Sequence, residues 1–244
     1  MTDSLFNRTE LLLGSEVMAR LRSCRVIIFG VGGVGSWCAE CLVREGIGHL
    51  TLVDSDVVCI TNCNRQLMAT TKTIGEPKVE ALRRRLLEIN PEADILALQK
   101  TFSKETAGEF CLESYDYVID AIDSLRDKVE LIMQGGPVLF SSMGAALRID
   151  PTKVRVSEFW KVKGDPLAAA MRSTMRRNKL LPARKFLCVH SEETPLPNLG
   201  TALEDGSKTY SKVQTNGSLA HITGIFGMTL AGLVVQDIKM RTTQ

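Results

Sequence analysis

The feature that most constrains the fold is a glycine-rich turn directly after an apolar run, in RVIIFGVGGVGSW at residues 25–37. The apolar run is typical of a fully buried parallel strand, and Ser36 opens a helical stretch that continues to about Glu45. The turn contains Gly30, Gly32, Gly33 and Gly35, and three of these satisfy G-x-G-x-x-G. Because it lies between a strand and a helix, its backbone N–H groups can face a phosphate. The turn predicts a nucleotide site, but NAD, FAD and ATP all fit it.

Strand-like and helix-like segments alternate through residues 1–145. The further expected strands are HLTLVD, DILAL, YDYVIDAID and PVLFSSM, and the further expected helices span residues 76–90, 104–113 and 125–134. This order predicts an α/β fold with a doubly wound, mostly parallel Rossmann-like sheet.

The regularity weakens after residue 145. KVRVSEF and KFLCVHS are expected strands, DPLAAAMRSTMRRN is an expected helix, and residues 191–214 are expected to form a long polar loop. Residues 217–235 carry no formal charge, but four glycines and His221 interrupt them, so a buried helix is favoured over a membrane span. We interpret residues 146–244 as a smaller, substrate-side extension of the nucleotide-binding region at 1–145.

Composition places the chain among ordinary globular proteins. Its 244 residues are 24% charged and 44% hydrophobic, with a net charge of +2 that does not by itself indicate a nucleic-acid partner. The N-terminal residues lack the apolar run of a signal peptide, and seven scattered cysteines fit a reducing compartment. We therefore expect a cytoplasmic protein that makes no membrane contact.

Polar residues downstream of the turn narrow the choice of nucleotide. Asp54 ends the second strand, where a carboxylate accepts hydrogen bonds from a ribose, and this also fits a dehydrogenase. Arg65, in NCNRQ, and Lys78 follow it, and clustered cations suit an enzyme that stabilises charge on a triphosphate. IDAIDS then supplies Asp120 and Asp123 at a strand end, where a carboxylate can hold Mg²⁺.

These motifs, in this order, resemble the ubiquitin-activating-enzyme-like adenylating superfamily that includes ThiF, MoeB and HesA. The resemblance rests on GVGGVGS, D-x-D…N-x-N-R-Q, the lysine of GEPK, and DAIDS. It implies ATP and Mg²⁺ as cofactors, with Gly32 and Gly35 lining the nucleotide turn and Asp54 holding the ribose. It also implies that Asn62, Arg65 and Lys78 bind the phosphates and that Asp123 places the magnesium.

Within this superfamily the chain looks like the tRNA threonylcarbamoyladenosine dehydratase branch. YVIDAIDSLRDKVELI, IDPTKVRV, DPLAAAMR, CVHSEE and FGMTLAG carry that likeness through most of the chain. It implies adenylation of the carboxylate of a modified tRNA adenosine, attack by the neighbouring carbamoyl-amide, release of AMP and net loss of water. An intramolecular attack gains its effective molarity from proximity, so no enzyme nucleophile is required.

The likeness also implies partners. FNRTELLLG resembles the N-terminal helix of the superfamily, whose arginine, here Arg8, reaches into the ATP site of the partner subunit, so a homodimer is expected. Some members of the branch are linked to sulfur relay through a cysteine before the last helix. The corresponding YSKVQTNGSLA has none, which argues against a sulfur-acceptor role.

A basic segment is the expected contact with tRNA. Residues 166–191 contain no acidic residue, and their cations are Arg172, Arg176, Arg177, Lys179, Arg184 and Lys185. An RNA backbone is attracted to such a surface, whereas the alternative interpretation is an ordinary solvated helix and loop.

Three other functions compete with the dehydratase hypothesis. A sulfur-carrier adenylating enzyme uses the same ATP pocket but usually carries two CxxC zinc pairs, and Cys38 with Cys41 is the only CxxC in this chain. A nicotinamide-dependent oxidoreductase has no need of Arg65 and Lys78. A catalytically silent nucleotide-binding scaffold has no need to keep Arg65, Lys78 and Asp123. His190 and His221 are interpreted as structural or exposed histidines.

Overall fold

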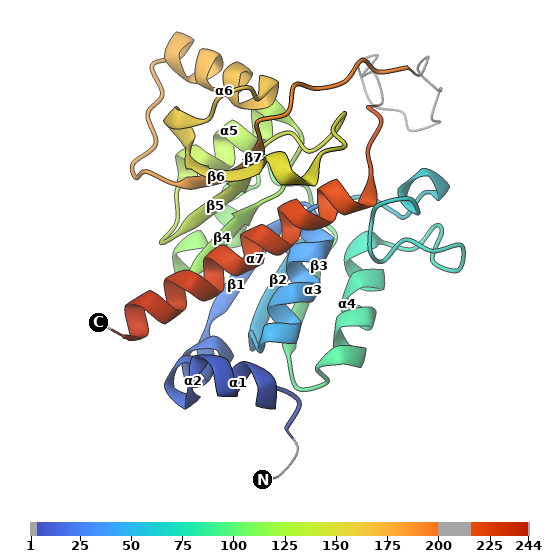
Figure 1. The fold of residues 1–244 in the computed structure, drawn as a ribbon, viewed down its shortest axis with the longest axis vertical. Coiled ribbons are helices and arrows are strands. Elements are labelled where there is room, and N and C mark those ends of the chain that lie inside the picture. The colour runs from blue at the N-terminus through green and yellow to red at the C-terminus, as the bar shows by residue number, and fades with distance from the viewer. Residues whose placement is uncertain (1–3, 200–215, 244) are drawn as a thin grey trace.

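A single seven-stranded sheet organises the chain in the computed structural model, which describes residues 4–199 and 216–243 (Figure 1). The strands are β1 (Arg25–Phe29), β2 (His49–Val53), β3 (Asp94–Leu98), β4 (Tyr117–Asp120), β5 (Leu139–Ser142), β6 (Val154–Glu158) and β7 (Leu187–Ser191). Their order is β3-β2-β1-β4-β5-β7-β6, and the pairs are parallel except that β6 runs antiparallel to β7. The predicted doubly wound, mostly parallel sheet is confirmed.

Helices connect and flank these strands. They are α1 (Asn7–Leu13), α2 (Ser15–Ser23), α3 (Gly35–Glu45), α4 (Lys78–Ile89), α5 (Leu125–Gln134), α6 (Pro166–Arg177) and α7 (Ala220–Thr242). The helix predicted over residues 104–113 is wrong. Two short 3₁₀ turns, Ala107–Phe110 and Leu112–Ser114, replace it, and Cys111 between them has φ of 44°. A residue in this left-handed region cannot continue a right-handed helix.

The strand order reverses next to β1. The chain forms β1, β2 and β3 in one direction, then returns to place β4 on the other side of β1. The carboxyl ends of β1 and β4 therefore diverge into loops at a topological switch point, which is where open α/β sheets bind ligands. The fold thus places the glycine-rich turn and the loop after β4 side by side.

Alternating side chains cover both faces of the sheet. Along β1, Val26 and Ile28 belong to the core under α3, α4 and α7, whereas Ile27 and Phe29 belong to a separate cluster on the opposite face. A further core, containing Phe159, lies between α5, α6 and β7. Buried parallel strands need helices on both faces, and this explains why β1 is apolar throughout.

The long C-terminal helix α7 crosses α3 on the front face of the sheet in Figure 1. It is long and apolar enough to span a membrane, but half of its most apolar window is buried inside the protein. A Cβ added to Gly227 would lie 2.3 Å from the carbonyl oxygen of Val34, so glycine is what lets the two helices approach this closely. The prediction of a buried C-terminal helix is confirmed.

Residues after 145 extend the same sheet. Pairing of β5 with β7 adds β7 and β6 to the strands of the nucleotide-binding region. Of the loop predicted over 191–214, residues 192–199 are irregular, and the remainder lies outside the described residues. Leu147 connects the two flanks of that stretch, because its N–H donates to Gly217 O (2.9 Å) and its carbonyl accepts from Leu196 N (2.8 Å).

Candidate nucleotide site

The turn after β1 depends on close backbone approach at two of its glycines. Gly30 has φ of 83°, and a Cβ added there would lie 2.6 Å from the carbonyl oxygen of Ala121, at the end of β4. A Cβ on Gly35 would lie 1.9 Å from the carbonyl oxygen of Gly30. The fold therefore requires glycine at both positions. Gly30 lets the turn approach the end of β4, and Gly35 lets α3 begin directly against the turn.

The other two glycines have different surroundings. A Cβ on Gly32 would make only ordinary contact, at 3.7 Å from Gln66 Nε2. At Gly33 it would lie 3.1 Å from Thr223 Cγ2, so α7 packs directly against the turn. The contact with α7 is therefore a packing reason for glycine at position 33.

Asp54 lies at the carboxyl end of β2 and holds the turn in place. Its carboxylate accepts from Val31 N and from Asp56 N, both at 2.9 Å. Burial raises the pKa of the Asp54 carboxyl, and the nearby Lys78 ammonium opposes that rise. Each carboxylate oxygen accepts more than one hydrogen bond, so these two contacts leave capacity for a ribose hydroxyl.

Lys78, the first residue of α4, brings a buried ammonium to the same edge. Its side chain is 7% exposed and its Nζ lies 2.7 Å from Asp56 Oδ2. A backbone bond from Lys78 N to Asp56 O (3.0 Å) fixes the start of the helix beside this loop. Asp56 was given no role in the sequence analysis, although it is the second acid of the D-x-D motif. The Lys78 ammonium is thus already held at this edge and needs little rearrangement to meet a phosphate.

Arg65 and Asn62 occupy the loop between β2 and α4. The Arg65 guanidinium donates to Thr61 O (3.0 Å) and Asn64 Oδ1 (2.9 Å), and burial lowers its pKa while the Asp123 charge opposes this. Asn62 Oδ1 accepts from Cys59 N (3.0 Å), so this predicted phosphate ligand also shapes its own loop. The loop thus holds Arg65 near the carboxylate predicted to place magnesium.

The two aspartates after β4 have separate environments. Asp120 is fully buried, with Lys128 Nζ 2.8 Å and Ser141 Oγ 2.6 Å from Oδ2, so it anchors α5 and β5 to β4. Asp123 is exposed at the switch point. Within residues 4–199 and 216–243 no cluster of three or more His, Cys, Asp or Glu is placed to hold a metal. A single carboxylate that acts together with substrate phosphates is a common way for proteins to bind Mg²⁺, and Asp123 fits it.

Gln66 was quoted in the sequence motif but was not assigned to the site. Its side chain is 6% exposed and faces Gly32, and no described group donates to its buried Oε1. A buried amide oxygen without a partner is costly unless a ligand or water satisfies it. The Gln66 amide therefore adds a buried polar group beside the turn. Sequence alone could not show it, because burial decides it.

Comparison with known proteins identifies the family. The family model of the ThiF family matches residues 6–243. The chain belongs to the ThiF family. It is similar to the tRNA threonylcarbamoyladenosine dehydratase of Bacillus subtilis, with 35% identity over 96% of this chain and 94% of that protein. It is also similar to the solved structure of Escherichia coli TcdA in complex with ATP, with a TM-score of 0.84, 31% identity and coverage of 98% of this chain and 95% of that one.

Other likenesses cover less of the chain or are more distant. The sulfur carrier protein adenylyltransferase of Thermus thermophilus is 32% identical over 135 residues, which is 54% of this chain. The structure of Escherichia coli MccB bound to ATP has a TM-score of 0.61 at 16% identity, which shows a shared fold only. Likeness to the dehydratases therefore extends through nearly the whole chain.

The one CxxC pair of the sequence lies inside a helix. Cys38 and Cys41 lie within α3, on the buried side of the sheet. Burial raises the pKa of Cys38 well above its usual value and that of Cys41 to about 11. A neutral thiol is a poor ligand, so both residues serve as small packing groups.

Arg8 lies far from the nucleotide turn of its own chain. It is an exposed residue of α1, and Figure 1 shows α1 and α2 at the amino ends of the strands, opposite the switch point. The homodimer expected from ThiF-family likeness brings Arg8 to an ATP site only if that site belongs to the other protomer. The role of Arg8 at that site stays a prediction.

The basic segment is divided between structural and free cations. Arg172 donates to Phe159 O (3.1 Å) and its guanidinium lies 5.8 Å from the centre of the Phe159 ring, so it fastens α6 to the core. Arg176 lies over the Trp160 ring at 5.7 Å. Arg177, Lys179, Arg184 and Lys185 are exposed. Positive charge that could contact RNA therefore lies mainly at the end of α6 and in the loop that follows.

His190 and His221 both have local partners. His190 is 2% exposed, its Nε2 lies 2.9 Å from Ser157 Oγ, and burial lowers its pKa despite the opposing charge of Asp165. His221 Nε2 lies 3.1 Å from Ile149 O. These contacts agree with the structural interpretation of both residues.

Proposed function

We propose that this chain is an ATP-dependent tRNA threonylcarbamoyladenosine dehydratase. The observation that carries the proposal is likeness to that enzyme class over both halves of the chain, 96% of its length, beyond the nucleotide half alone. Solved relatives in this class include Escherichia coli TcdA with ATP and with AMP. The reaction adenylates the carboxylate of the modified adenosine, and attack by the carbamoyl-amide of the same arm releases AMP and closes a ring.

ATP supplies the leaving group that makes this carboxylate reactive. The chain's own residues bind and orient the reactants. In this proposal Asp54 accepts ribose hydroxyls and the backbone around Gly32 meets the phosphates at the start of α3; the contact between Asp54 and the turn supports both roles. Arg65 and Lys78 stabilise charge on the phosphates in the same proposal, and Asp123 would hold Mg²⁺. The buried Lys78 ammonium and the interaction of Arg65 with the Asp123 charge support these roles. Arg8 is proposed to enter from a second protomer.

The runner-up function is activation of a small ubiquitin-like sulfur carrier. It would use the same nucleotide site, and the likeness to the Thermus thermophilus adenylyltransferase, over 54% of this chain, supports it. The two functions differ in the acceptor carboxylate, which belongs to tRNA in one and to a protein C-terminus in the other. A cytoplasmic location follows from the tRNA substrate and is part of the proposal.

One experiment separates these functions. Purified protein is incubated with ATP, Mg²⁺ and tRNA that carries or lacks threonylcarbamoyladenosine, and AMP and nucleoside mass are followed. We expect AMP to accumulate only with the modified tRNA, together with loss of one water from the nucleoside. AMP formation without that mass change would reject the dehydratase function.

A further inference from the structure

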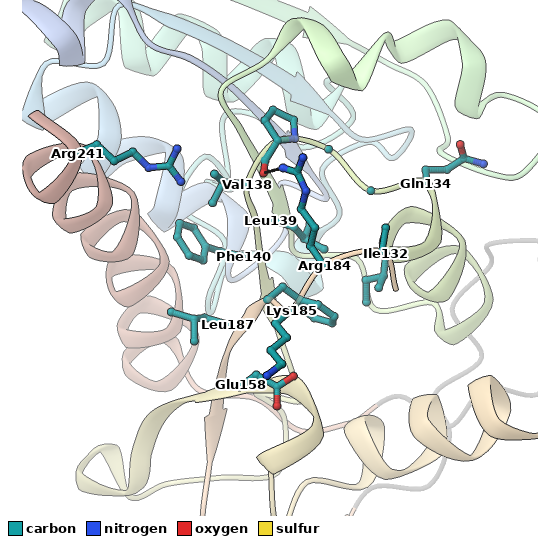
Figure 2. A pocket seen from close by; sticks show the side chains of 15 residues that line it. Ile132, Gln134, Val138, Leu139, Phe140, Glu158, Arg184, Lys185, Leu187 and Arg241 are labelled. Carbon is teal, nitrogen blue, oxygen red and sulfur yellow. Dashed lines mark hydrogen bonds between the residues drawn. The ribbon is translucent and has the colours of Figure 1, made fainter. Parts of the chain in front are cut away.

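A groove of about 550 Å³ lies at the amino ends of β5 and β7, away from the nucleotide turn (Figure 2). We define this amino-edge groove by Arg184, Lys185, Arg241 and Glu158, with the backbone of residues 134–138 along one side. The C-terminal ends of α5 and α7 and the start of β7 meet there. Nothing assigned to the nucleotide site lines it.

Three cations from separate parts of the chain line this groove. Arg184 and Lys185 come from the loop between α6 and β7, and Arg241 comes from the last turn of α7. Arg184 donates to Pro137 O (2.9 Å), which fixes the guanidinium against the groove wall. Arg241 pairs with Asp237 at 2.6 Å, whereas Lys185 makes no ion pair with any described residue. The one carboxylate in the lining is Glu158, so the groove has a net positive charge.

Glu158 adds a different kind of contact. Its Oε2 accepts from Trp160 N (3.2 Å), but its buried Oε1 has no partner in the described part of the chain. Figure 2 shows that Lys185 and Glu158 point toward one another in the groove. A ligand that offers both anionic groups and hydroxyl donors would suit the cations and the Glu158 carboxylate that line this groove. The sugar–phosphate backbone of RNA has both, because its 2′-hydroxyl donates where DNA has no donor.

The basic loop connects this groove to α6. Figure 1 shows the chain leaving the end of α6 and running down the side of the domain to β7. Arg176 and Arg177 in the last turn of α6, and Lys179 after it, are exposed along this path. A strand of RNA that occupies the groove would therefore continue over further cations.

We infer that the amino-edge groove holds the phosphate backbone of the tRNA substrate at a distance from the reacting adenosine. The inference rests on the proposed function, because that function makes tRNA the partner. It gives an RNA-binding role to Arg241, which lies outside the basic segment. It also places binding of the RNA backbone away from the nucleotide turn, where the reaction takes place. Strands β1 and β2 have five residues each, so the groove and the nucleotide turn lie at opposite edges of a sheet only about 16 Å deep, which a folded RNA spans.

The test compares two charge-matched double variants. Lys185→Gln with Arg241→Gln removes two groove cations and leaves Arg184, whose hydrogen bond supports the wall. Arg22→Gln with Lys104→Gln removes two exposed cations, neither of which forms an ion pair with a described residue, from α2 and from the segment after β3. Binding of fluorescent, unmodified tRNA is measured by anisotropy without ATP over a range of salt concentrations.

We expect the groove variant to raise the Kd for tRNA on the order of tenfold and to reduce the salt slope by about two, one for each lost phosphate contact. The control variant should bind like the wild type. In turnover, the groove variant should raise the KM for tRNA and leave kcat unchanged, because the nucleotide site is intact. A groove variant with the same Kd and slope as the control would overturn the inference.

Two further measurements keep the outcomes distinct. If the double variant fails to fold, Lys185→Gln alone is used, and a salt slope unchanged from wild type would then count against the groove. A DNA stem-loop should compete less well than RNA of the same sequence, and equal competition would reject the role of Glu158. The binding measurement uses no ATP, so it tests the groove independently of catalysis. If the wild type does not dehydrate the modified tRNA, the proposed function is rejected, and the binding comparison still decides whether the groove holds RNA.

Discussion

Lys78 and Arg65 bring two positive charges to the partly buried edge of the sheet beside the nucleotide turn. We predict that Lys78→Ala and Arg65→Ala each lower kcat for AMP formation by about 10²–10³-fold, the usual cost of losing one preorganised charge-stabilising donor. Asp56, the partner of Lys78, has a side chain that is 66% exposed and stays hydrated when the lysine is removed. The melting temperature should therefore change little. Single-turnover assays with radiolabelled ATP measure the loss.

Arg84→Ala is the matched control for Lys78→Ala. It also removes one paired cation from α4, the partner of Glu76 at 2.7 Å, but the Arg84 side chain is 56% exposed and was assigned no role at the turn. Its turnover should equal that of the wild type. If Arg84→Ala and Lys78→Ala lose activity equally, the assignment of Lys78 to the phosphates is wrong.

Glu45, the last residue of α3, gives the chain a predictable response to pH. Burial raises the pKa of its carboxyl from 4.5 to about 7, and the helix C-terminus also disfavours a negative charge. The folded state thus binds this proton more tightly than the unfolded state. Its stabilising effect is complete below about pH 4.5 and is lost as pH rises to about 7.

We therefore predict that Glu45→Gln stabilises the protein at pH 8 more than at pH 5, measured by urea unfolding at both values. The carboxylate is absent from the variant, so its stability should fall less as pH rises. Glu113→Gln, at an exposed position, is the control and should show no such difference. An equal effect of Glu45→Gln at both pH values would contradict the linkage.

At the level of elements, α7 is the helix that connects the C-terminal region to the nucleotide turn. Gly227 lets α7 approach α3, and a Cβ there would lie 2.3 Å from Val34 O and 2.8 Å from Cys38 N. Because both are backbone atoms that cannot rotate away, we predict that Gly227→Ala destabilises the protein by about 1–3 kcal/mol. Gly232→Ala, on the same helix with no atom within 4 Å, is the matched control.

Gly232→Ala should be neutral or stabilising by up to about 1 kcal/mol, because alanine favours a helix over glycine. Chemical denaturation of both variants measures the difference. Since Thr223 of the same helix contacts Gly33, Gly227→Ala should also weaken ATP binding. If both glycines tolerate alanine equally, the close crossing of α7 over α3 is wrong.

The elements themselves could be predicted from sequence where burial and periodicity agree. DILAL and residues 125–134 match β3 and α5 residue for residue, because each has clear turn or cap residues at its ends. Residues 104–113 could not be resolved, since the left-handed Cys111 is set by packing and not by local propensity. Likewise, Asp120 and Asp123 look equivalent in IDAIDS, and only the buried Lys128 shows that one is structural. Contacts between distant segments, such as Thr223 with Gly33, leave no local signal.

For the whole molecule, the position of Arg8 makes a specific demand on assembly. Arg8 lies on α1 at the amino ends of the strands, whereas the turn it is proposed to serve lies at their carboxyl ends. In a homodimer with two-fold symmetry, each protomer would complete the site of the other. Arg8→Ala and Asp123→Ala proteins should each be inactive alone, because each lacks one component of both sites.

Mixing the two proteins under conditions that exchange subunits should restore activity. Half of the dimers are then hybrids, and one site in each hybrid combines an intact Asp123 with an Arg8 from the partner, so turnover should reach about one quarter of wild type. The control mixes Asp123→Ala with Lys78→Ala, whose defects lie in the same protomer's site, so each hybrid retains no intact site and stays inactive. Recovery of activity in the first mixture alone is the pattern that only a site shared between protomers produces. No recovery there, with exchange verified by mass spectrometry, would place Arg8 outside the reaction.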